Sequence, residues 1–134
     1  SGVDNKDSSF ERHKNKMDVI MKRSSKVEDE VLNTLAEFLV DDGIVLISVP
    51  AGKGGAVLLQ DSLGYYTAQW EYEEKSWHRI TNHEKFDLIE EFFYSFDNNK
   101  WNRELSINGL KNKTSELKEH AEGLAICLLR KSGK

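Results

Sequence analysis

Apolar residues recur along the chain at two different spacings, and the change between them divides it into elements. From Val27 to Leu39 they repeat every three or four positions, which is the spacing of one face of an α-helix. Ser25, with Glu28 three residues later, has the spacing of a capping box at a helix start. The pattern therefore predicts an N-terminal helix, which the glycine of Asp41-Asp42-Gly43 should end.

Beyond Gly43 the period becomes that of β-strands. Four runs, IVLISVP, AVLLQ, YYTAQWEY and SWHRI, are separated by short segments of hairpin length. In the third run Tyr66, Ala68, Trp70 and Tyr72 alternate with polar neighbours and so share one face, which we expect to pack on helices. The runs predict four antiparallel strands in a meander.

Helical spacing returns at Thr81, which has Glu84 three residues later in a second capping-box pattern. Phe86, Ile89, Phe93 and Phe96 then form an apolar stripe. The opposite side of this predicted helix carries three acidic residues, Asp87, Glu90 and Glu91.

A last helix is predicted from about Thr114, with Arg130 and Lys131 in its final turn. Strands that are grouped together and flanked by helices indicate an α+β fold. The expected architecture is an N-terminal helix, a four-stranded antiparallel meander sheet and two further helices packed on one face.

The length of 134 residues and the continuous hydrophobic pattern predict a single domain over residues 23–134. Residues 1–22 mix charges with Ser and Asn without a sustained period, and we interpret them as a tag remnant or flexible leader. No run approaches the length of a membrane span, so we expect a cytoplasmic protein with no membrane partner. Cys127, the single cysteine, is expected in the core rather than as a reactive thiol.

Charge is distributed unevenly and changes the expected partner. Residues 27–110 contain 6 Lys and Arg against 16 Asp and Glu, a net charge of −10 within a chain whose total is −4. Such a field repels phosphate backbones and attracts basic surfaces. We therefore expect no nucleic-acid partner and favour a basic protein.

No group of residues forms a recognisable catalytic or metal site. The glycine-rich segment 50–55 leads into a predicted strand, whereas a phosphate loop must open a helix. The four histidines are far apart and have no metal-ligand spacing, and the carboxylate pairs are adjacent residues whose side chains diverge. We therefore expect no enzyme activity, no cofactor and no metal.

A sheet covered by helices on one side leaves its other face open, and aromatic residues and Arg are favoured anchors at protein interfaces. An acidic rim around such anchors would steer a basic partner towards them. The candidate partner-binding residues are Tyr65, Gln69, Glu71, Glu73, Glu74, His78, Arg79, Asp87, Glu90 and Glu91.

The layout from about Val27 to Phe96 includes VLNTLAEFL, GIVLISV, GYYTAQWEY, SWHRI and the acidic FDLIEEFFYSF. This layout resembles the bacterial immunity proteins of polymorphic-toxin and contact-dependent growth-inhibition systems. The resemblance implies a protein, monomeric or weakly homodimeric, that neutralises a cognate toxin. Its acidic, aromatic-containing surface would cover the active site of a basic domain such as a nuclease.

Two other functions remain open from the sequence. One is a class I type III secretion chaperone-like protein, which would bind an effector segment as a homodimer. The other is a small-ligand-binding or enzymatic domain, which would need a deep polar pocket lined by Tyr65, His78, Arg79 or Trp101.

Overall fold

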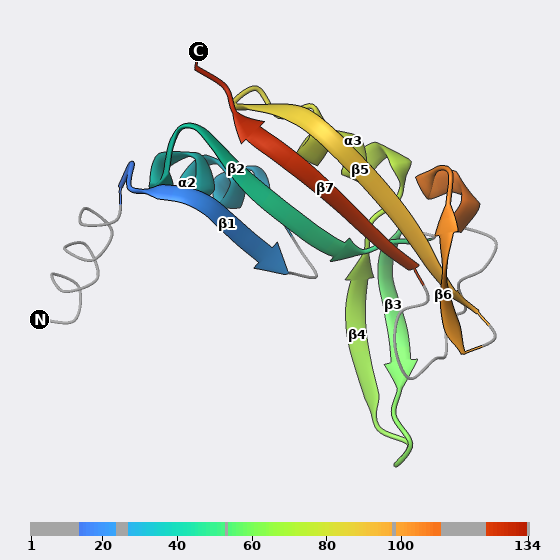
Figure 1. The fold of residues 1–134 in the computed structure, drawn as a ribbon. Coiled ribbons are helices and arrows are strands. Elements are labelled where there is room, and N and C mark those ends of the chain that lie inside the picture. The colour runs from blue at the N-terminus through green and yellow to red at the C-terminus, as the bar shows by residue number, and fades with distance from the viewer. Residues whose placement is uncertain (1–13, 24–26, 53, 98, 111–122, 134) are drawn as a thin grey trace, which may run out of the picture.

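A mixed sheet of five strands, in the order β1-β2-β7-β5-β6, forms the centre of the molecule (Figure 1). The computed structural model describes residues 14–23, 27–52, 54–97, 99–110 and 123–133. The strands are β1 (Met17–Arg23), β2 (Leu39–Pro50), β5 (Phe86–Asp97), β6 (Lys100–Glu104) and β7 (Gly123–Lys131). β1 runs parallel to β2, and the other neighbouring strands are antiparallel. The carboxyl ends of β1, β2 and β5 therefore point the same way.

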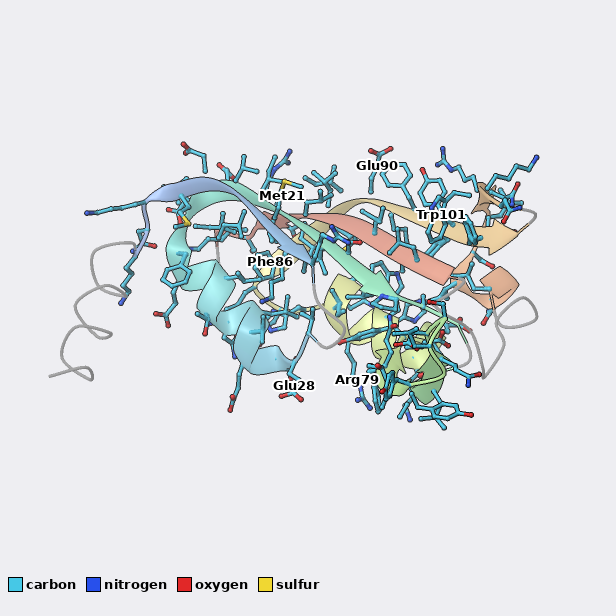
Figure 2. The ribbon with its side chains drawn as sticks, turned by 90° about the horizontal axis from the view of Figure 1, so that it is seen from below. Met21, Glu28, Arg79, Phe86, Glu90 and Trp101 are labelled. Carbon is cyan, nitrogen blue, oxygen red and sulfur yellow. The ribbon has the colours of Figure 1, made fainter. Side chains whose placement is uncertain are left out.

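Two α-helices lie on the same face of this sheet (Figure 2). Helix α2 (Asp29–Phe38) connects β1 to β2, α3 (Glu74–Thr81) precedes β5, and the 3-10 helix η1 (Ile107–Leu110) follows β6. A second sheet consists of the hairpin β3 (Gly55–Gln60) and β4 (Tyr66–Glu71), which is inserted between β2 and α3. Among the described residues, no helix has the length and apolar composition that a membrane crossing requires.

The core lies between the five-stranded sheet and the two helices. Burial alternates along β2 and β7, because successive side chains of a strand point to opposite faces. From α3, the fully buried Trp77 meets Phe93 edge to face at a centroid distance of 6.0 Å. The buried hydrophobic residues of β2, β7 and α2 are Leu39, Val45, Ile47, Val49, Ala125, Cys127, Leu129, Leu32, Leu35 and Ala36.

Neither α2 nor α3 covers the opposite face of the sheet, which we call the open face. Met21, Glu90 and Trp101 point to this side, away from Glu28 and Arg79 (Figure 2). Its apolar side chains are partly or largely exposed, and they come from all five strands. They include Val19, Met21, Leu46, Phe92, Tyr94, Trp101, Ile126 and Leu128.

The predicted four-stranded antiparallel meander with an N-terminal helix and two further helices is wrong. The stripe over Phe86–Phe96 belongs to the strand β5, and SWHRI lies in helix α3. β2 pairs with β1 and β7 instead of β3. Apolar residues on both faces of a central strand imitate helical spacing, and a run of five residues is too short to show its period.

The ends of the domain also differ from the sequence-based picture. Residues 17–22, interpreted as part of a leader, form most of β1, whereas residues 1–13 lie outside the described part of the chain. The last predicted helix falls partly on residues 111–122, which are not described, and its remainder is the strand β7.

The first predicted helix is present as α2, but it follows the strand β1 in the described part of the chain. Its N-cap is Glu28, which makes no side-chain capping hydrogen bond, and the predicted N-cap Ser25 lies outside the described residues. The predicted stop at Asp41–Gly43 lies inside β2, which begins directly after Phe38. The hairpin between β3 and β4 forms as expected, with its turn at Asp61–Tyr65.

Candidate functional site

A groove of about 320 Å³ lies where the chain leaves the carboxyl ends of β1 and β2. In open sheets with parallel strands, ligands bind outside the carboxyl ends of the strands. The groove is formed by the N-terminal turn of α2, the end of β4 and one side of α3. Its lining residues are Val27, Glu28, Asp29, Leu32, Trp70, Tyr72, Ser76, Arg79 and Ile80.

Tyr72 joins the walls of this groove. Its backbone N–H donates to the carbonyl of Pro50 at 2.8 Å, and its own carbonyl accepts from Gly52 at 2.8 Å, which attaches the end of β4 to the end of β2. Its buried hydroxyl donates to the carbonyl of Val27 at 2.9 Å and accepts from the N–H of the same residue. Tyr72 therefore holds the entry to α2 in place beside β2.

Helix α3 brings a cation to the groove. Its capping box is reciprocal: Ser76 N–H donates to the Glu73 carboxylate, and Glu73 N–H donates to Ser76 Oγ, both at 3.0 Å. Residues three apart in a helix lie on one face, so Arg79 follows Ser76 along the groove wall. The capping box therefore fixes the start of α3 and, with it, the position of Arg79 in the groove wall.

The wall formed by α2 is acidic. Glu28 is the N-cap of the helix and Asp29 its first residue, and both are exposed. Glu28 and Arg79 both lie on the helical side of the sheet (Figure 2). The groove thus has carboxylates on one wall and a guanidinium on another. The partly exposed side chain of Trp70, on β4, also lines it. A guanidinium binds carboxylate or phosphate through paired hydrogen bonds, and carboxylates accept from amines and hydroxyls.

Of the ten predicted partner-binding residues, the described groove includes Arg79 alone. Tyr65 is exposed at the tip of the β3–β4 hairpin, Gln69 is half-buried on β4, and Glu71 is only 1% exposed. The buried Glu71 does not offer an acidic surface to a partner. The remaining α3 residues are Glu73, which caps the helix, and the exposed Glu74 and His78.

The three acidic residues of the predicted helix do not share a face. On strand β5 Glu90 points to the open face, whereas Glu91 lies beside the core, where Trp77 Nε1 donates to its carboxylate at 3.3 Å. Asp87 is exposed and lies opposite Arg130 of β7. Asp87 and Glu90 therefore remain together on the open face, and Glu91 alone is turned to the helical side.

Sequence reasoning missed most of the groove. Glu28 was assigned to a capping box, and Trp70 and Tyr72 to a face of the sheet. The contact that joins them, from Tyr72 to Val27, spans 45 residues and leaves no periodic signal. The run Glu28-Asp29 at a helix start was the available clue, but acidic residues are common there because they suit the helix dipole.

The structure also bears on two other expectations from the sequence, the glycine-rich segment and the metal site. The segment around Gly54 and Gly55 has positive φ angles of 93° and 80° and leads into the strand β3, so it does not open a helix as a phosphate loop must. It connects the two sheets and is not the predicted hairpin turn. Within the described ranges, no three His, Cys, Asp or Glu side chains converge as a metal site would require.

No protein-family model and no curated protein matches the chain. Among solved structures, it is similar to a SAM-dependent methyltransferase from Methanosarcina mazei, with a TM-score of 0.60 and 9% sequence identity. The match covers 91% of this chain and 62% of that protein, so the chain spans less than two thirds of its neighbour's length.

This likeness corrects the expectation that the chain has no enzyme activity. That expectation rested on the absence of sequence motifs, whereas the shared fold is one on which an enzyme is built. At 9% identity the likeness concerns the fold alone, and a fold by itself does not specify an activity.

Proposed function

We propose that the chain is the acceptor-binding part of a methyltransferase-type domain and holds a small polar methyl acceptor in the groove beside Tyr72. The observation that carries this proposal is the groove itself, with acidic and cationic walls at the carboxyl ends of β1 and β2. The structural likeness to a SAM-dependent methyltransferase supports the reaction class.

The lining residues favour an acceptor that has both an anionic group and an amine or hydroxyl. Arg79 binds the anionic group, and Glu28 and Asp29 accept hydrogen bonds from the amine or hydroxyl. Trp70 covers the apolar part of the molecule. A volume of about 320 Å³ is at the lower end for ligand pockets, which suits a small molecule better than a polymer.

S-adenosylmethionine is the cofactor that the likeness implies. In doubly wound sheets a nucleotide-type cofactor rests on a glycine-rich turn between a strand and a helix. Between β1 and α2 the chain has no such turn, since no glycine occurs between Gly2 and Gly43. The groove residues therefore do not fit this cofactor, and we assign them to the acceptor alone.

Binding of small dipolar molecules tests the proposal. NMR titration of the 15N-labelled chain with γ-aminobutyrate or O-phosphoethanolamine should shift the amide signals of Val27–Leu32, Tyr72 and Ser76–Ile80. Acetate and ethylamine, which carry one charged group each, should bind more weakly. Arg79→Ala should lower the affinity for the dipolar probes about tenfold or more, because it removes a charge-assisted hydrogen bond.

Arg103→Ala is the matched control. Arg103 is also exposed, but it lies on β6, where its guanidinium sits 4.9 Å from the centre of the Phe92 ring on the open face. This variant should bind the probes like the wild type. If millimolar probe leaves the groove signals unmoved, or if both arginine variants lose affinity equally, the groove is not the acceptor site.

Neutralisation of a basic toxin, effector binding as a chaperone and a cytoplasmic location stay untested predictions. Glu71 is buried and Glu91 lies beside the core, so of these four acidic residues only Asp87 and Glu90 remain together on the open face as support for the first of them. We therefore prefer the groove as the functional site.

A further inference from the structure

The outer edge of β1 is unusual for a strand in a parallel pair. Within the described part of the chain β1 is hydrogen-bonded to β2 alone, so its other edge has no strand beside it. Val19 and Met21 are 63% and 71% exposed on the open face. Parallel pairs belong to buried parts of sheets, and a long apolar edge strand is a template for pairing with another chain.

The sequence of β1, MDVIMKR, is complementary to itself. When two copies pair antiparallel about Ile20, Asp18 of each copy lies opposite Lys22 of the other. Val19 then lies opposite Met21, so the two exposed apolar side chains cover each other. Opposite charges and apolar residues that face each other across strands are the pairs that stabilise a sheet.

Other registers lose this match. Directly opposed residues must point to the same face, so the next possible centres are Val19 and Met21. Centring on Val19 places Asp18 opposite Ile20, and centring on Met21 places Lys22 opposite Ile20. Both registers put a charge against an apolar residue, which selects Ile20 as the centre.

A second feature lies beside this edge on the helical side. A groove of about 410 Å³ is lined by Lys22 of β1 and five residues of α2, Glu30, Val31, Thr34, Leu35 and Phe38. Ile20, which packs against the core, is on the same side of the sheet as this groove. A strand added at the edge would therefore place its own Ile20 towards the apolar residues of the groove, and its Asp18 opposite Lys22, which lines the groove.

We propose that two copies of this chain form a symmetric dimer through antiparallel pairing of β1 about Ile20, which joins their five-stranded sheets into one. The two-fold axis makes each contact occur twice, so both Asp18–Lys22 pairs form together. The inference is independent of the acceptor groove, which is formed by α3, β4 and different residues of α2.

Charge exchange at the two positions tests the dimer by sedimentation velocity. D18K and K22D should each raise the dissociation constant about tenfold or more, because each places like charges opposite one another at both pairs. The double variant D18K/K22D should dimerise like the wild type. A mixture of the two single variants should form a heterodimer, since one chain then has only lysines at these positions and the other only aspartates.

D87K is the matched control, because Asp87 is an exposed aspartate of β5, away from this edge, and its exchange should leave the dimer unchanged. Cysteine pairs test the register. A chain carrying V19C and a second chain carrying M21C should form an intermolecular disulfide when they are mixed and oxidised, because directly opposite residues have neighbouring Cβ atoms. Two chains that both carry V19C should not form this disulfide. Cys127 is buried and does not compete.

A wild-type chain that sediments as a monomer up to about 100 µM overturns the proposal, as it would place the dissociation constant above that of a specific dimer. A dimer that D18K and K22D leave unchanged, or a disulfide between two V19C chains, would overturn the β1 pairing and its register. The titration of the acceptor groove is read from separate residues, so either inference can fail alone.

Discussion

Burial decides the chemistry of individual residues in this protein more than their type does. Cys127 is fully buried on β7, where desolvation, followed by the negative charge of Glu91, raises the pKa of its thiol to about 12. The expectation that it is a core residue is confirmed, although its side chain projects from a strand and not from a helix. A neutral thiol in this position packs as a small apolar group and is a poor nucleophile.

The raised pKa of Cys127 predicts a loss of stability in alkaline solution. As the pH rises above the ordinary value of 9.0, the unfolded chain releases the thiol proton while the folded chain retains it until about pH 12. The free energy of unfolding should therefore fall by about 1.4 kcal/mol per pH unit in this range from this group. Urea unfolding between pH 8 and about 10.5 measures it.

Cys127→Ala is the reference for this measurement, because lysines and tyrosines also titrate in that range. The wild type should lose about 2 kcal/mol more than the variant by pH 10.5. Parallel pH profiles for the two proteins would show that the thiol is ionised or accessible in the folded state.

At the scale of elements, short-range pattern and long-range packing disagree most at β5 and α3. β5 is central and carries apolar side chains on both faces, so its sequence satisfies a helical stripe as well as a strand. α3 has only eight residues, but Trp77 and Ile80 are three apart and buried, and the Glu73–Ser76 capping box satisfies the first amides. A short helix of this kind depends on its cap and on burial more than on propensity.

Removing the cap of α3 should therefore weaken both the helix and the groove. Ser76→Ala deletes one half of the reciprocal capping box and should cost about 1 kcal/mol of unfolding free energy. Because Arg79 is one turn further along, the affinity for γ-aminobutyrate should fall as well. Thermal unfolding and the NMR titration measure the two effects.

Thr34→Ala is the matched control in α2. Its hydroxyl donates to the Glu30 carbonyl on the exposed side of the helix, and losing it should change stability by less than about 0.5 kcal/mol. A Ser76→Ala variant as stable as Thr34→Ala would mean that the capping box does not stabilise α3.

For the molecule as a whole, the two sheets differ in how much of their surface is packed against other elements. The five-stranded sheet is covered on one face by α2 and α3, whereas the β3–β4 hairpin extends away from it (Figure 1). The hairpin exposes Leu58, Tyr66 and Trp70, and its end is attached through the Tyr72 backbone to β2. A two-stranded hairpin alone is only marginally stable in water.

Native-state hydrogen exchange should separate these two parts. Amides in β2, β7 and the central part of β5 should exchange only through global unfolding, whereas amides of β3 and β4 should exchange through a local opening of lower free energy. Exchange followed by NMR or mass spectrometry gives both values. Equal protection in the hairpin and in β7 would show that the two sheets unfold as one unit.

The sequence by itself determined the local features of this protein. The apolar face of α2, the strand character of residues 44–50 and the turn that closes the β3–β4 hairpin all follow from spacing and turn chemistry within a few residues. The buried character of Cys127 follows from its apolar neighbours. Of the candidate groove, Arg79 was identified, but only as part of a different surface.

Tertiary structure alone decided which strands are neighbours and where the groove lies. The pairing of β7 between β2 and β5 joins segments about 80 residues and 40 residues apart, and the Tyr72–Val27 contact spans 45. Such choices depend on which apolar faces are buried together over the whole chain, because periodicity reports only that a residue has a buried side and not what covers it. β5 forms a strand because both of its edges are hydrogen-bonded to neighbouring strands, β7 on one side and β6 on the other.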